Sequence, residues 1–190
     1  QMVREAAAAT EEIIRLMPRL RAELDRLGLK RVRLVADSDA RDWQGMFHVT
    51  GDGALEIVIG ASMDPMGTLH HEVIHALRAM NLFTPEEWRA LELAAERVWI
   101  RKHDIEARYP DLTRAEQIEE AIAEEFSEAL AARRSPKGSA LVTAFNKIAR
   151  LFRALRNVLN GAGYQTAEDI FGRILAGEIS KRQAGNTGMR

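Results

Sequence analysis

The segment Thr68-Leu69-His70-His71-Glu72-Val73-Ile74-His75-Ala76-Leu77-Arg78 decides how the rest of the chain is interpreted. It holds the spacing H-E-x-x-H, in which His71 and His75 stand four residues apart. On a helix such residues lie one turn apart on one face, so both imidazoles can reach one Zn²⁺ ion. Glu72 lies beside them, where its carboxylate can accept a proton from a metal-bound water. We therefore predict a helix with a zinc site on one side.

A zinc site of this kind needs a third protein ligand. The metzincin pattern would place a histidine six residues after His75, but the residue there is Asn81. The glutamate-rich segment 116–130 offers a carboxylate instead. On a helical wheel Glu120 and Glu124 share a face with small residues, which indicates close packing against another helix: Ala123, Ser127 and Ala131. Three other acids lie off this face and are expected in solvent: Glu119, Glu125 and Glu128.

Composition excludes several other classes of site and protein. The 190 residues contain no cysteine, which excludes thiolate zinc sites, iron–sulfur clusters and cysteine nucleophiles. The sequence has no run of about 18 apolar residues, so we expect no membrane-spanning helix. Charged residues near the start interrupt any secretory signal, which predicts a cytoplasmic protein. Residue 1 is Gln rather than Met, which indicates a domain cut from a longer protein.

Helical and extended patterns flank the motif. Apolar residues recur at helical spacing over 3–28, with Gly28 as a stop, and three short runs are typical of strands: 31–36, 46–50 and 54–60. The turn Gly51-Asp52-Gly53 joins the last two runs as a hairpin. Helix-start signals then predict helices over about 85–103, 114–133, 137–159 and 167–175. These patterns predict an α+β fold with a small N-terminal antiparallel sheet and a helical majority.

The site residues resemble the gluzincin plan of zinc metallopeptidases, in which H-E-x-x-H is followed by a glutamate on a later helix. The string Glu120-Ala-Ile-Ala-Glu124-Glu-Phe126 is similar to the E-x-x-A-E-x-F pattern of anthrax-lethal-factor-like zincins. This resemblance implies that His71, His75 and Glu120 bind the metal and that Glu124 stands just behind it. A competing alignment, with the E-G-F-A-E string of a zinc aminopeptidase family, makes Glu124 the ligand instead.

A second resemblance covers residues 30–175. The motif segment, the following Leu82-Phe83-Thr84-Pro85-Glu86-Glu87-Trp88 and the segment 163–171 resemble zincin domains inside large polyvalent proteins of phages and conjugative elements. This resemblance implies a zincin-like metallopeptidase core over 1–133. It also implies a protein of a phage or mobile element, delivered together with its DNA.

The implied mechanism assigns further roles. Zinc activates water, Glu72 acts as general base, and another donor stabilises the oxyanion. We expect Tyr109 to be that donor, with His103 and His70 as weaker candidates; the alternative for Tyr109 is a packed aromatic side chain. The resemblance to zincins also implies that strand 54–60 is a sheet edge that pairs with an extended peptide substrate.

The charge of the chain is distributed unevenly. Residues 1–130 carry 16 Lys and Arg against 25 Asp and Glu, whereas residues 131–190 carry 11 against 3. We therefore expect a basic helical lobe over 134–180 and a disordered tail over 181–190.

Three functions remain open at this point. The leading hypothesis is a zinc metalloendopeptidase that hydrolyses peptide bonds in a protein substrate. The basic lobe motivates an alternative, a zincin-fold binding or structural module of a phage protein that contacts nucleic acid without significant proteolysis. A third possibility is a toxin or effector peptidase that acts on one host protein. The sequence predicts no oligomeric state.

Overall fold

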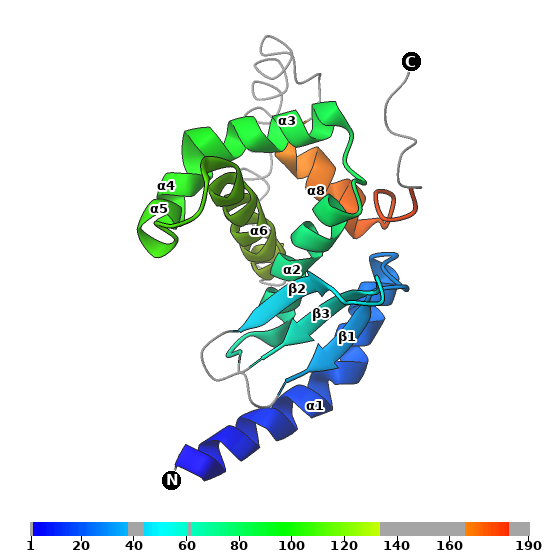
Figure 1. Cartoon of the computed structure of the whole chain (residues 1–190). Coiled ribbons are helices and arrows are strands. Elements are labelled where there is room, and N and C mark those ends of the chain that lie inside the picture. Colours follow the sequence, from blue (N-terminus) through cyan, green and yellow to red (C-terminus); the bar gives the residue numbers. More distant parts are fainter. Residues whose placement is uncertain (1, 38–43, 61, 134–165, 183–190) are drawn as a thin grey trace.

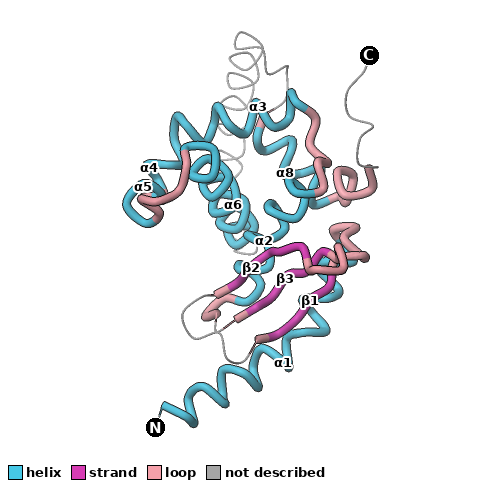
Figure 2. Tube along the Cα trace, in the orientation of Figure 1, coloured by secondary structure: helices cyan, strands magenta, loops and turns pink. Residues whose placement is uncertain are grey.

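The computed structural model describes residues 2–37, 44–60, 62–133 and 166–182, which form a mainly helical α+β fold (Figure 1). The strands are β1 (Arg33–Ala36), β2 (Gly45–Val49) and β3 (Leu55–Ile59). The helices are α1 (Met2–Arg26), α2 (Pro65–Ala79), α3 (Pro85–Ala94), the π-helical turn η1 (Ala95–Trp99), α4 (Ile100–Lys102), α5 (Ile105–Arg108), α6 (Arg114–Arg133) and α8 (Ala167–Leu175). The small sheet lies between α1 on one side and the group of α3, α4, α5, α6 and α8 on the other (Figure 2).

The three strands form one mixed sheet in the order β1-β3-β2. Strands β2 and β3 pair antiparallel through the predicted hairpin, whereas β1 runs parallel to β3. The prediction of an antiparallel sheet is therefore wrong for β1. The reason is that β1 pairs with β3 and not with β2, its neighbour in the sequence. The chain reverses direction between β1 and β2 and again at the hairpin, so β3 runs in the same direction as β1. The buried Ile57 and Ile59 lie on this central strand.

Helix α2 carries the H-E-x-x-H motif, as predicted, and local chemistry sets both of its ends. At its start the Asp64 carboxylate accepts a hydrogen bond from the Gly67 N–H at 3.0 Å, and Pro65 occupies the first turn. Just beyond its end Asn81 has a φ of 52°, the left-handed conformation that stops a helix. Of the apolar side expected from the sequence, Val73, Ile74 and Leu77 are fully buried, whereas Met80 at the end of the helix is half-buried.

Helix α6 packs directly against α2. The Ser127 hydroxyl donates a hydrogen bond to the Gly67 carbonyl oxygen at 2.9 Å. A Cβ atom at Gly67 would collide with the Asp64 carboxylate and approach the Ser127 hydroxyl to 3.3 Å. Ala123, on the same face of α6, is fully buried. The small residues predicted on this face therefore allow the two helices to approach closely.

The buried carboxylate of Glu87 joins the C-terminal segment to α3. It is 1% exposed and lies 2.6 Å from Arg173 Nη1 and 2.9 Å from Arg182 Nη2. It also accepts a hydrogen bond from the Thr84 N–H at 2.8 Å, which completes the predicted capping box. Burial alone would raise the pKa of Glu87, but the hydrogen bonds from Arg182 and Thr84 hold it below its usual range.

Segment 166–182 shares its core with the preceding helices. Helix α8 begins where the sequence predicts a helix start, with a capping box between Thr166 and Asp169. Its Phe171 stacks on Trp99 with ring centroids 5.8 Å apart and meets Phe126 edge-on at 5.1 Å. These aromatic contacts fasten α8 to η1 and α6.

The sequence predicts a basic helical lobe and a disordered tail in the C-terminal part of the chain. The disordered tail predicted over 181–190 is wrong at Arg182, because its guanidinium is held by Glu87 and donates to the Leu82 carbonyl oxygen at 3.0 Å. Of the predicted basic lobe over 134–180, residues 134–165 lie outside the described residues. The helix expected at 137–159 and the nucleic-acid contact assigned to it stay predictions.

Replacing Glu87 tests this junction. The change Glu87→Gln keeps an oxygen for the capping box but leaves two guanidinium groups without their carboxylate. We expect it to lower the free energy of unfolding by about 2 kcal/mol, measured by urea denaturation. The neighbouring exposed Glu86 provides the matched control, since Glu86→Gln is expected to change the free energy by less than about 0.5 kcal/mol. Equal effects of the two changes would contradict the role of Glu87.

Candidate metal centre

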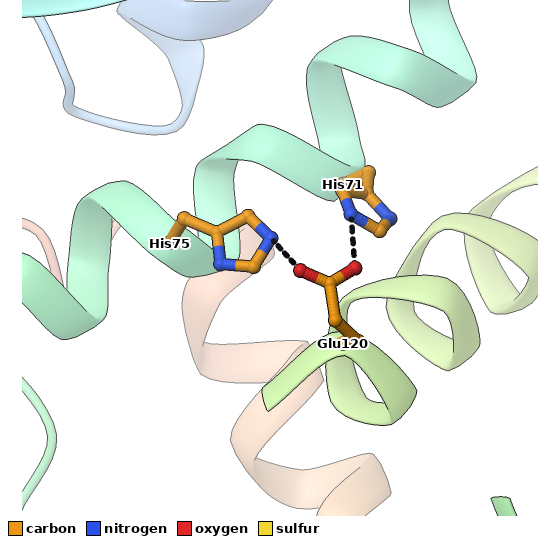
Figure 3. A group of neighbouring side chains, drawn as sticks. All are labelled: His71, His75 and Glu120. Carbon is orange, nitrogen blue, oxygen red and sulfur yellow. Dashed lines mark ion pairs between the residues drawn. The ribbon is translucent and has the colours of Figure 1, made fainter. Parts of the chain in front are cut away.

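Three predicted ligands converge between α2 and α6. The Glu120 carboxylate points between the two imidazoles (Figure 3), with Oε2 3.2 Å from His71 Nε2 and Oε1 3.5 Å from His75 Nε2. One donor atom from each residue lies within 4.8 Å of the other two. All three side chains are half-buried, with 17–19% of each side chain exposed. Helix packing therefore brings residues 45 or more positions apart in sequence to one point.

The donor set, two imidazole nitrogens and one carboxylate, is one that Zn²⁺ takes in proteins. Zinc bonds to such atoms are about 2.0–2.1 Å long, which places neighbouring ligand atoms about 3.4 Å apart. The distances of 3.2 and 3.5 Å are close to this value and reach the two different oxygens of Glu120. Three protein ligands would leave the fourth position open, which is typical of catalytic rather than structural zinc sites.

Glu119 is a site residue that the sequence analysis missed. Its Oε1 lies 2.7 Å from His75 Nδ1, so this pair leaves His75 Nε2 directed at Glu120. Burial would lower the pKa of His75, but the Glu119 hydrogen bond and the nearby charges of Glu120 and Glu72 raise it overall. A carboxylate behind a histidine in this way fixes the orientation of the ring and increases its basicity.

Glu120 itself is held in the ionised form. Burial would raise its pKa, but the hydrogen bond from His71 and the charges of His75 and Arg108 lower it overall. An ionised carboxylate is the form that binds a metal ion. The electrostatics of the site therefore favour the ligand assignment made from the sequence.

Glu72 lies beside the three donors and is 7% exposed. Burial raises its pKa, as does the nearby charge of Glu120, against the charges of the two histidines. Its carboxylate also accepts a hydrogen bond from the Phe47 N–H of strand β2. A Cβ atom at Gly45 would collide with Thr68 and lie 3.1 Å from Glu72 Oε1. Glycine at this position therefore lets β2 reach the carboxylate.

Glu124 does not take the position expected for it. Its Oε1 lies 2.6 Å from Arg108 Nη2, and it is Glu119 that contacts His75. Glu124 lines the same cleft one turn beyond Glu120. The prediction that Glu124 stands behind the metal is therefore wrong. The reason is that Arg108, at the end of α5, draws the carboxylate away from the histidines.

Tyr109 lines the cleft with Glu120 and Glu124. Its hydroxyl accepts a hydrogen bond from Arg108 Nη2 at 3.3 Å. Burial raises the pKa of Tyr109, and the charges of Glu120 and Glu124 add to this effect. The phenol is therefore protonated at neutral pH and has a proton to donate.

The two weaker candidates for an oxyanion donor lie elsewhere. His70 is 2% exposed and its Nε2 lies 2.9 Å from Glu23 on α1. His103 Nε2 lies 2.9 Å from Glu125 on the seam between α4 and α6. Neither histidine lines the cleft. The expectation that either one could serve the site is therefore wrong, since both are held by carboxylates of neighbouring helices.

Two glutamates that were expected in solvent take part in an ionic cluster. Lys102 Nζ lies 2.6 Å from Glu125 and 2.9 Å from Glu128, and His103 lies beside the same oxygens. The Lys102 ammonium already compensates both carboxylates. This cluster ties α4 to α6.

The site lies in an open cleft of about 1000 Å³ that follows α2. Its walls come from the start of β2, both ends of α2 and the facing side of α6. A cleft of this size is large enough for a peptide or a small molecule.

Comparisons with known proteins find no relative of this chain. No protein family's sequence profile, no curated protein and no solved structure matches it. Among the described residues, no helix is long and apolar enough to cross a membrane. The resemblance to zincins therefore stays a prediction based on the residues of the motif.

The role of Glu119 can be tested through metal affinity. We expect Glu119→Ala to weaken zinc binding 10- to 100-fold, because His75 loses the partner that orients its ring. Competition with a chromophoric chelator measures this change. Glu124→Ala is the matched control on the same helix and should change the affinity less than about threefold. A larger loss from Glu124→Ala than from Glu119→Ala would contradict this assignment.

The close approach of β2 to Glu72 predicts the effect of a single methyl group. We expect Gly45→Ala to push β2 away from α2 and to lower the free energy of unfolding by about 1–3 kcal/mol in urea denaturation. Gly51→Ala is the control, since a Cβ atom there meets nothing within 4 Å. Similar stability of the two variants would refute the close contact.

Proposed function

We propose that this chain is a zinc-dependent peptidase. The observation that carries the proposal is the convergence of His71, His75 and Glu120, with the buried carboxylate of Glu72 beside them. The H-E-x-x-H spacing alone has a non-functional interpretation, in which two histidines have an unrelated glutamate between them. A third donor at the spacing of a zinc site, on another helix, supports the functional interpretation.

Each residue of the site has a role in this proposal. Zn²⁺ held by the two histidines and Glu120 would act as a Lewis acid and lower the pKa of water toward ~7. Glu72 accepts the proton of the attacking water and passes it to the amine that leaves. Its raised pKa suits this role, because a carboxyl group closer to neutrality gives a proton back more readily.

Tyr109 is the proposed donor to the carbonyl oxygen of the substrate. Its phenol is protonated and lies in the cleft beside Glu120. A fixed donor at this position would stabilise the negative charge that develops on the oxygen. Arg108, which already donates to the phenol oxygen, holds the ring in place.

Strand β2, and not the strand at 54–60, is the proposed substrate edge. The strand at 54–60 is the central β3, which is paired on both sides, so its expected role as an edge is wrong. The Thr50 N–H donates to the Ala54 carbonyl and the Gly60 N–H to the Gln44 carbonyl. Because backbone groups alternate along a strand, those of Gly45, Phe47 and Val49 point away from β3. The Phe47 N–H donates to Glu72. An extended peptide can add along the other groups of this edge, beside Glu72.

The change Glu72→Gln separates metal binding from catalysis. We expect this variant to keep its zinc but to cleave a fluorescence-quenched peptide library 10²- to 10⁴-fold more slowly, because the general base is lost. Glu86→Gln, on the exposed surface of α3, is the matched control and should cleave at the wild-type rate. Undiminished cleavage by Glu72→Gln would refute the proposal.

A further inference from the structure

We propose that Arg78 selects substrates that carry a carboxylate group close to the scissile bond. This inference rests on the proposed peptidase function and extends it to a class of substrate. Arg78 lies in the last turn of α2, three residues after His75, and its side chain lines the same cleft. Three residues advance a helix by about 4.5 Å, so the backbone of Arg78 lies about one turn beyond that of His75.

The guanidinium of Arg78 stacks on an aromatic side chain, that of Trp88. Its central carbon lies 4.0 Å from the centroid of the Trp88 ring. Trp88 is buried and packs in turn on Phe83, with ring centroids 5.4 Å apart. An arginine stacked in this way uses its flat face for the cation–π contact and keeps the N–H groups along its edge for another partner.

Among the described residues, no hydrogen-bond or ion-pair partner lies at that edge. In the part of the chain that the structure describes, no carboxylate forms an ion pair with Arg78. The other arginine of the cleft, Arg108, differs because Glu124 lies 2.6 Å from its Nη2. Arg78 is therefore the positive charge of the described cleft that remains available to a ligand.

The two ends of the cleft carry opposite charges. The carboxylate of Asp64 caps one end of α2, and Glu72, Glu119 and Glu120 lie along its middle. Arg78 lies at the opposite end of the helix. An anionic group would be repelled from the Asp64 end and attracted to the Arg78 end. The planar edge of a guanidinium also matches a carboxylate with two parallel hydrogen bonds.

The distances limit where this carboxylate lies on the substrate. Residues of an extended peptide are about 3.3 Å apart, so one helical turn corresponds to one or two residues. The carboxylate can belong to an Asp or Glu side chain within about two residues of the scissile bond. It can equally be the C-terminus of a short peptide. Both sources present the same group to Arg78.

Binding to a protein that cannot cleave tests this inference. The probes are fluorescein-labelled, amidated octapeptides with one Glu, scanned through each position, and their counterparts with Gln. We expect the zinc-loaded Glu72→Gln protein to bind the best Glu peptide about tenfold more tightly than its Gln counterpart, measured by fluorescence anisotropy. Adding Arg78→Gln should bring this ratio close to one without changing the Kd of the Gln peptide.

Three matched comparisons complete the experiment. Arg89→Gln should leave the preference intact, since Arg89 lies on the surface of α3 and pairs with Glu92. Arg78→Lys, which keeps the charge but loses the planar edge, should give an intermediate ratio. A Gln peptide with a free C-terminus tests whether Arg78 binds a terminal carboxylate. If it does, this peptide binds as tightly as the best Glu peptide. If Arg78 binds only a side-chain carboxylate, this peptide binds as weakly as the amidated Gln peptide.

Two results would overturn the inference: equal binding of Glu and Gln peptides at every position, or a preference that survives Arg78→Gln. A different result would contradict the proposed function: a wild-type protein that cleaves no peptide of the library. In that case the anisotropy measurement still decides whether Arg78 binds a carboxylate.

Discussion

The close packing of α2 against α6 is the constraint on which the site depends. Helices usually lie 8–10 Å apart, according to the size of the residues at their contact. Here Gly67, Ala123 and Ser127 lie at the contact, and the Ser127 hydroxyl donates directly to the Gly67 carbonyl oxygen. Glu120 lies about two turns before Ser127 on α6 and faces both histidines across this contact. The ligand geometry is thus a result of backbone packing.

The same packing concentrates negative charge in a partly buried cleft. Glu72, Glu119 and Glu120 lie around two histidines, and burial together with the charge of Glu120 raises the pKa of Glu72. Burying like charges costs free energy unless a counter-charge is near. A divalent cation between the donors would supply that counter-charge, so we expect metal binding to stabilise the fold.

Local patterns in the sequence predicted most of the elements. The capping boxes of Thr84 and Thr166 begin their helices as predicted, and Gly51-Asp52-Gly53 forms the hairpin, because these signals act within a few residues. The direction of β1 depends on a pairing between distant segments, which local patterns do not contain. The roles of Glu119 and Glu124 depended on the rotation of α6 about its axis and on Arg108, which a helical wheel does not include.

The most direct test of the account is the zinc content of the purified protein after dialysis without chelator. It compares the wild type with Glu120→Ala. The account predicts about one zinc ion per wild-type chain and a clear loss in the variant, because two histidines alone bind the ion weakly. A wild-type protein that holds no zinc, even after zinc is added back, would contradict the central claim. Full zinc retention in Glu120→Ala would contradict the assignment of the third ligand.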